Sequence, residues 1–99
     1  MALWFVSRHS GARAWARARS LQVDHWAEHL DVEDVSEGDV VVGTLPVDKI
    51  AGINARGARF LALCLDLTPE MRGRELTPDD METLGGRLVE YRVERVEST

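Results

Sequence analysis

The chain has 99 residues, of which 44% are hydrophobic and 29% are charged, and its formal net charge at pH 7 is −5. This length leaves room for one domain with its own core but not for two, and no apolar run approaches the roughly 20 residues of a membrane-spanning helix. Because residues 1–23 hold four arginines and no acid, whereas the remainder is acidic, we expect a small polyanion as ligand and neither duplex nucleic acid nor a membrane as partner.

A strand, a polar turn and a helix open the chain. An apolar run predicts a buried β-strand over residues 2–7, and periodicity predicts a helix over about residues 11–20. Ser7, Arg8 and His9 stand where the strand gives way to the helix. Open α/β sheets bind ligands at the carboxyl ends of strands, and the free N–H groups of a helix N-terminus suit phosphate. This turn is therefore the first candidate site.

Apolar runs and turn residues place the remaining elements. Three consecutive valines favour a buried strand, and Thr77, followed by a proline and two aspartates, is typical of a helix N-cap. The expected elements are a strand over 26–30, a polar connection over 32–39, a strand over 40–42, a helix over 46–55, a strand over 59–67, an irregular segment over 69–76, a helix from Thr77 to Gly85, and a strand over 87–96 with a helix as the alternative. The alternation indicates a single α/β domain over residues 1–99, with a mainly parallel sheet and helices on both faces.

The carboxyl ends of the first, third and fourth strands should share one edge of this sheet. That edge would carry Ser7-Arg8-His9, Gly43-Thr44 and Leu65-Asp66, which are mainly donors and cations with a single acid, Asp66. The sequence has neither a Walker A motif nor G-x-G-x-x-G, so it does not favour ATP binding or dinucleotide binding. The pattern favours a phosphate-binding edge without a nucleotide fingerprint.

Structural interpretations of the same residues stay open. The arginines of the first segment could form a solvated helix face, Ser7 could cap the helix, and Trp15 could pack the helix onto the sheet. Asp24 and His25 precede the second strand, at the opposite end of the sheet, so we expect a structural or interface role for Asp24 and keep His25 as a weaker ligand candidate. The segment Arg72-Gly73-Arg74 follows the fourth strand on the ligand side and could either cover the ligand or form a basic turn.

Five separated motifs carry a family resemblance. They are Ser7-Arg8-His9-x-Gly11-Ala12-x-x-Trp15, Asp24-His25, Gly43-Thr44-Leu45-Pro46, Arg56-Gly57-Ala58-Arg59 and Arg72-Gly73-x-Glu75-Leu76. In this order, and over nearly the whole chain, they resemble a small family of CRISPR-associated ring nucleases that accompanies type III CRISPR systems. Ser10 and Phe60 stand where that family more often has proline and tyrosine, and neither touches the expected chemistry.

The resemblance implies a homodimer of compact Rossmann-like subunits, related to the CARF domains that sense cyclic oligoadenylate. It also implies cleavage of that messenger, foremost cyclic tetra-adenylate, without a cofactor, so that the antiviral response is switched off. The catalytic residues would be Ser7, Arg8 and His9. The substrate-binding residues would be Gly11, Trp15, His25, Gly43, Thr44, Leu45, Asp66 and Arg72.

Such a ring can be opened without a metal ion. The ribose 2′-OH attacks the neighbouring phosphorus and expels the 5′-oxygen, which leaves a linear product with a 2′,3′-cyclic phosphate. This reaction is accelerated by in-line geometry, by donors to the phosphoryl oxygens and by a histidine that transfers a proton. A metal site is the rival, but the spacing of its possible ligands matches no tight motif. Those ligands would come from His9, His25, His29, Asp24 and Asp31.

Two hypotheses compete with an enzyme. One is a binding module that sequesters the messenger without cleaving it, and the other is an accessory subunit of a larger effector complex. The lone Cys64 excludes an internal disulfide and fits a reduced, cytoplasmic setting, and no secretory leader is expected because the first apolar run is too short.

Overall fold

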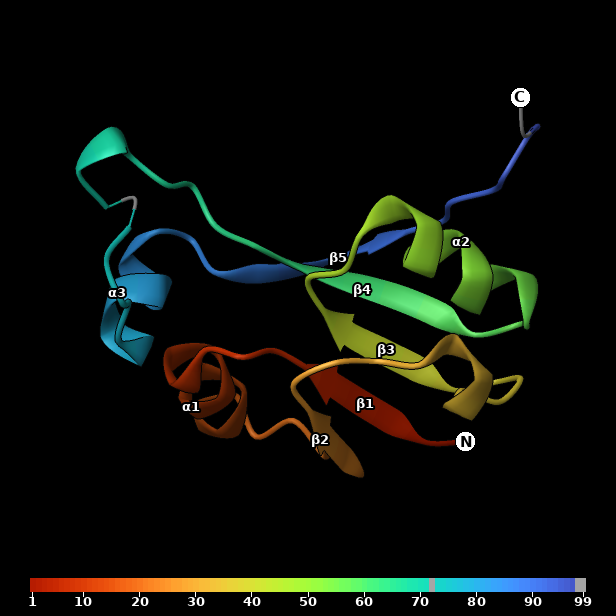
Figure 1. The fold of residues 1–99 in the computed structure, drawn as a ribbon. Coiled ribbons are helices and arrows are strands. Elements are labelled where there is room, and N and C mark those ends of the chain that lie inside the picture. Colours follow the sequence, from red (N-terminus) through yellow and green to blue (C-terminus); the bar gives the residue numbers. More distant parts are fainter. Residues whose placement is uncertain (72, 98–99) are drawn as a thin grey trace.

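Within residues 1–71 and 73–97, which this computed structural model describes, five strands form one sheet in the order β2-β1-β3-β4-β5 (Figure 1). The first four strands are parallel, and β5 is antiparallel to β4. The strands are β1 (Leu3–Val6), β2 (His25–Ala27), β3 (Val40–Gly43), β4 (Arg59–Cys64) and β5 (Arg87–Tyr91). The carboxyl ends of β1 to β4 therefore meet at one edge, as the sequence predicts.

Helices cover both faces of the sheet (Figure 1). α1 (Ser10–Ala18) and α3 (Pro78–Thr83) pack on one face, and α2 (Val47–Ala55) with the 3-10 turn η1 (Val32–Asp34) packs on the other. A second 3-10 turn, η2 (Pro69–Met71), lies in the long connection between β4 and α3. None of the helices in the described ranges is long and apolar enough to cross a membrane. The α/β prediction with two covered faces is confirmed.

The strand side chains alternate between two core clusters. Val6, Val41 and Phe60 belong to the cluster under α2, whereas Phe5 and Val42 belong to the cluster under α1 and α3. All five are at most 2% exposed. A sheet that is covered on both faces needs apolar side chains on both sides of each strand, so continuous apolar runs rather than polar alternation mark these strands.

Two aspartates tie the amino ends of the strands together. Asp39 precedes β3 and is 5% exposed. Its Oδ1 accepts from Ala2 N at 2.9 Å, and its Oδ2 accepts from Ser36 N at 3.0 Å and from Trp4 Nε1 at 3.2 Å. The N–H donors of Ser36 and Ala2 hold the pKa of Asp39 below its ordinary value. Asp24 accepts from the first N–H of β1 at 2.8 Å, which confirms the structural role expected for it.

The second, fourth and last strands differ from the prediction in length, and β4 ends at Cys64 instead of residue 67. β2 ends at Ala27 instead of residue 30, because Leu30 leaves the sheet and is buried in the cluster under α2. β5 is the expected strand and not the alternative helix, but it ends at Tyr91 and turns antiparallel to its neighbour. His29, left outside the shortened β2, is exposed.

Candidate functional site

Polar residues follow neighbouring strands at the carboxyl edge of the sheet. Ser7 follows β1, Glu28 follows β2, and Thr44 follows β3. Because β2, β1 and β3 are consecutive in the sheet order, these residues lie along one edge, where α1 begins. This is the edge that the sequence predicted to carry a ligand.

A cavity of about 230 Å³ opens at this edge. Its apolar lining comes from α1, from β4 and the segment after it, and from α3. Its polar and backbone lining comes from Ser7, His9, Gly43, Thr44, Arg74 and Glu75. The structure thus brings four residues predicted for the site, from two separate motifs, to one cavity.

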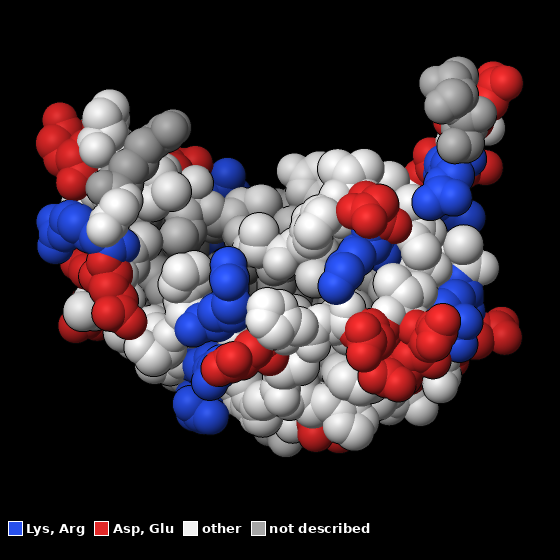
Figure 2. Space-filling model, viewed as in Figure 1, with Lys and Arg blue, Asp and Glu red and all other residues white. Residues whose placement is uncertain are grey.

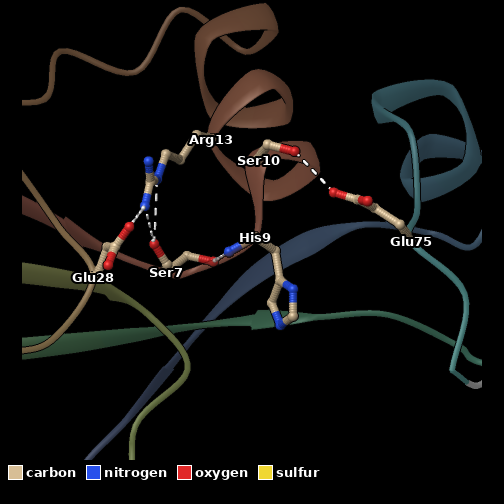
Figure 3. Close-up of polar contacts among 6 residues, drawn as sticks. All are labelled: Ser7, His9, Ser10, Arg13, Glu28 and Glu75. Atoms are coloured by element: carbon tan, nitrogen blue, oxygen red, sulfur yellow. Dashed lines mark hydrogen bonds and ion pairs between the residues drawn. The ribbon is translucent and has the colours of Figure 1, made fainter.

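Hydrogen bonds hold the turn after β1 in place (Figure 3). Ser7 N donates to Ala27 O at 2.9 Å, and Ser7 Oγ accepts from His9 N at 3.1 Å. Arg13 donates to Ser7 O from Nε at 3.2 Å and from Nη2 at 2.9 Å. Arg13 Nη2 also lies 3.4 Å from Glu28 Oε1. The turn is therefore tied to both β2 and α1.

His9 presents its imidazole to the cavity. It is the N-cap residue of α1, yet its side chain makes no capping bond. The ring is directed away from Ser10 and Glu75 (Figure 3), and in the described ranges nothing hydrogen-bonds to its nitrogens. The first helical bond of α1 runs from Arg13 N to His9 O at 3.3 Å, so the N–H groups of the three residues between them have no intrahelical acceptor. An imidazole and helix N-terminal donors therefore stand together.

Gly43 brings the two central strands close together at the cavity. Its φ is +146°, and a Cβ at this position would overlap Val6 O, so glycine is required. Val6 and Gly43 are partners in the β1–β3 register. The residue after each, Ser7 and the exposed Thr44, therefore lines the same cavity, and both are hydroxyl residues.

The connection between β4 and α3 supplies another wall. Arg74 and Glu75 line the cavity from this segment. Ser10 Oγ donates to Glu75 Oε1 at 2.9 Å, which joins the segment to the start of α1 (Figure 3). Arg72, which the sequence predicted to contact substrate, lies outside the described residues.

Trp15 and Gly11 belong to the core and not to the cavity. Trp15 is 1% exposed, and its Nε1 donates to Glu82 Oε1 at 2.9 Å, so its ring offers no free face to an adenine. Arg19 also donates to Glu82, at 2.8 Å, and together these donors lower the pKa of that carboxyl. Gly11 lies so close to Leu76 O that a Cβ would overlap it. The packing interpretation of Trp15 is the one that the structure supports.

Three other predicted residues lie near the edge without lining the cavity. Arg8 is exposed in the turn between Ser7 and His9. Leu45 packs against the cluster under α2. Asp66 is exposed and pairs with Arg87 at 3.3 Å. Of the three, Arg8 is the one placed to approach an anion bound at the turn.

His25 stands at the opposite edge of the sheet. It is the first residue of β2, and its ring centroid lies 4.3 Å from that of Trp4. Nowhere in residues 1–71 and 73–97 do three His, Cys, Asp or Glu side chains gather as metal ligands. The described residues therefore do not form the alternative metal site that the sequence allowed. The metal independence of the reaction stays a prediction.

Among the polar residues at this edge, sequence reasoning missed Arg13 and Glu28. Arg74 and Glu75 belong to the motif that begins at Arg72, and Arg74 was part of the segment expected either to cover the ligand or to form a basic turn. The pairing of Arg13 with a backbone carbonyl follows from no sequence pattern. Figure 2 shows basic side chains gathered over α1 and acidic side chains toward η1, in line with the uneven charge of the chain.

A family model described as "Putative CRISPR-associated protein (Cas_VVA1548)" matches residues 4–94. The chain belongs to this family. No curated protein and no solved structure matches it. The Cas_VVA1548 match spans the whole cavity, from the turn after β1 to α3. The match supports a CRISPR association for the chain, at the level of its family.

Proposed function

We propose that this Cas_VVA1548 protein is a ring nuclease that binds and cleaves cyclic oligoadenylate, foremost cyclic tetra-adenylate, and so switches off type III antiviral signalling in the cytoplasm. The observation that carries the proposal is the His9 imidazole, which lines one cavity with Ser7 and Thr44 at the carboxyl edge of parallel strands. Ligands of open α/β sheets bind at this edge. The CRISPR association of the family and the resemblance of the motifs to CARF-related, Rossmann-like ring nucleases support the choice of cyclic oligoadenylate as the ligand.

The reaction suits the groups that are present. The ribose 2′-oxygen attacks the adjacent phosphorus, the bond to the 5′-oxygen breaks, and a 2′,3′-cyclic phosphate and a 5′-OH remain. His9 takes the proton from the 2′-OH or gives one to the departing 5′-oxygen. The hydroxyls of Ser7 and Thr44, the N–H groups of the first turn of α1, and Arg8 donate to the phosphoryl oxygens. Because the nucleophile belongs to the substrate, no activated water is needed, and we propose that no metal ion takes part.

Two copies of the chain would bind one ring. A cavity of about 230 Å³ is smaller than the roughly 300–1,000 Å³ of ordinary small-molecule sites, and a ring of four nucleotides exceeds it. A two-fold homodimer presents two equivalent cavities, and the four-nucleotide ring can itself be two-fold symmetric. This match is the reason to propose a homodimer as the binding unit.

One observation favours a second candidate, a protein that sequesters the ring without cleaving it. No carboxylate in the described ranges orients the His9 ring, although general bases in enzymes are often oriented by a third group. Both candidates predict binding at the same cavity. Only the nuclease predicts that binding and turnover respond differently to the loss of one side chain.

The test compares His9→Ala with His29→Ala, a matched control because His29 is an exposed histidine outside the cavity. The affinity for cyclic tetra-adenylate and the single-turnover cleavage rate are measured for both. Loss of an acid–base group should slow cleavage by about 10²–10⁴-fold, while the Kd changes by less than about tenfold. His29→Ala should behave like the parent protein. Unchanged cleavage by His9→Ala would refute the assigned role, and tight binding by a parent protein that never cleaves would favour sequestration.

A further inference from the structure

We propose that Arg13 is a positioning residue that holds the Ser7–His9 turn in its reactive arrangement. The proposal rests on the proposed function, because it assigns how the candidate catalytic turn is kept in place. Arg13 itself does not line the cavity. It acts through Ser7 and His9, both of which do.

The turn needs such a support because it belongs to no regular element. β1 ends at Val6, and α1 begins at Ser10. Among the described residues, one backbone bond anchors the turn to β2, from Ser7 N to Ala27 O. The Arg13 side chain adds a second anchor, because its guanidinium donates twice to the carbonyl of Ser7, whereas the helical bond from Arg13 N to His9 O would form with any side chain at this position.

The guanidinium is itself fixed on two sides. It meets one carbonyl oxygen with two N–H groups, at 3.2 Å from Nε and 2.9 Å from Nη2, and it faces Glu28 at 3.4 Å. The Arg13 side chain is 28% exposed, so water competes only in part for these donors. A fork of two donors fixes the direction of a carbonyl, which the point charge of a lysine cannot do. The position of Ser7, and through the Ser7–His9 bond the start of the His9 backbone, follows from this contact.

A direct role in phosphate binding is the competing explanation for an arginine near such a site. The two explanations differ in kinetics. Loss of a phosphate ligand weakens binding, whereas misplacement of a reactive group slows the chemical step and leaves ground-state binding almost unchanged. In the structure the Nε and Nη2 groups of Arg13 already donate to Ser7 O, which favours a positioning role over a phosphate contact.

The experiment compares Arg13→Met, Arg13→Lys and the matched control Arg17→Met. Arg17 lies one turn further along α1, and its guanidinium stacks 4.4 Å from the Trp26 ring centroid instead of touching the turn. For each variant the Tm, the Kd for cyclic tetra-adenylate and the single-turnover cleavage rate are measured. Because small misplacements of reacting groups are costly, Arg13→Met should lose about 10–100-fold in cleavage rate with a Kd within about threefold of the parent. Arg13→Lys should recover only part of the rate, and Arg17→Met should match the parent.

Amide hydrogen exchange on the free protein gives a second readout that needs no substrate turnover. The His9 N–H, bonded to Ser7 Oγ, should exchange faster in Arg13→Met than in the parent or in Arg17→Met, while the strand amides of β3 stay protected. If the parent protein does not cleave the ring, the proposed function fails, and exchange at His9 alone decides whether Arg13 orders the turn. Parent-like cleavage together with parent-like exchange in Arg13→Met overturns the inference. A raised Kd at an unchanged rate also overturns it, in favour of a phosphate contact.

Discussion

Asp39→Asn tests whether one nearly buried carboxylate joins β1 to β3. Both oxygens of Asp39 accept N–H groups: Oδ1 from Ala2, and Oδ2 from Ser36 and from the Trp4 indole. Asparagine keeps the shape but replaces one of these oxygens with an NH₂ group. Whichever way the amide is turned, at least one N–H donor then faces another donor.

The cost follows from the bonds that change. Hydrogen bonds to a charged partner contribute about 1.5–3 kcal/mol each, and a neutral amide oxygen keeps only part of that. One bond is lost outright and the others weaken, so the free energy of unfolding at pH 7 should fall by about 2–4 kcal/mol. Asp31→Asn is the control, because Asp31 makes no side-chain cap bond in front of η1 and is exposed. Its effect should stay within about 0.5 kcal/mol.

The pH dependence supplies a second check. The donors around Asp39 lower its pKa from the ordinary 3.8, so the folded protein holds this proton less tightly than the unfolded chain. A lowered pKa stabilises the fold at pH values above 3.8, and the contribution is lost as the pH falls through the lowered native pKa. The stability gap between the parent and Asp39→Asn should therefore narrow below about pH 4.

Urea unfolding followed by tryptophan fluorescence, at one fixed protein concentration and between pH 7 and pH 3, measures this gap. Other carboxylates with lowered pKa values, such as Asp80 and Glu90, are present in both proteins and cancel in the difference. A loss below about 1 kcal/mol at pH 7 would contradict the magnitude worked from the three bonds. A gap that stays constant down to pH 3 would contradict the assignment to a charged Asp39.

Two further substitutions probe the turns around the site. Gly43→Ala should lose at least about 2 kcal/mol of stability, because a Cβ would overlap Val6 O in the β1–β3 pair, whereas Gly38→Ala, at another positive φ but in open space, should lose only about 1 kcal/mol from backbone strain. If chemical denaturation showed the same loss of unfolding free energy for both variants, the overlap at Gly43 would be relieved without cost. Thr77→Ala removes the capping box of α3 and should lower the Tm by about 4–8 °C, equivalent to about 1 kcal/mol. A Tm within 1 °C of the parent, at about the error of the measurement, would mean that the box contributes nothing.

The sequence predicts the central sheet well because burial on both faces demands continuous apolar runs. β1, β3 and β4 are such runs, and the structure places all three side by side. The ends of the edge strand β2 were harder to predict, because a strand of three residues gives too short a pattern to define them. The antiparallel course of β5 has no signature in its own residues, since it depends on how α3 returns the chain.

The candidate site was predictable only where topology brings it together. Ser7, His9, Gly43 and Thr44 meet because residues that follow parallel strands share an edge. The prediction that Trp15 contacts the substrate was wrong. The sequence does not distinguish a tryptophan that stacks on a ligand from one that fills the core. The burial of Trp15 between α1 and the sheet, which depends on the facing strands and on α3, is a tertiary property. Arg74 and Glu75 lie in a segment without helical or strand periodicity, so only the motif that begins at Arg72 pointed to them.

Whether the protein opens the ring without a metal ion is tested by incubating it, purified, with excess cyclic tetra-adenylate in the presence of EDTA and resolving the products by liquid chromatography and mass spectrometry. We expect linear oligoadenylate ending in a 2′,3′-cyclic phosphate, formed over many turnovers per protein chain. A ring that stays intact while it co-elutes with the protein would contradict cleavage. Products that form only after a divalent metal ion is added back would contradict the metal-independent attack.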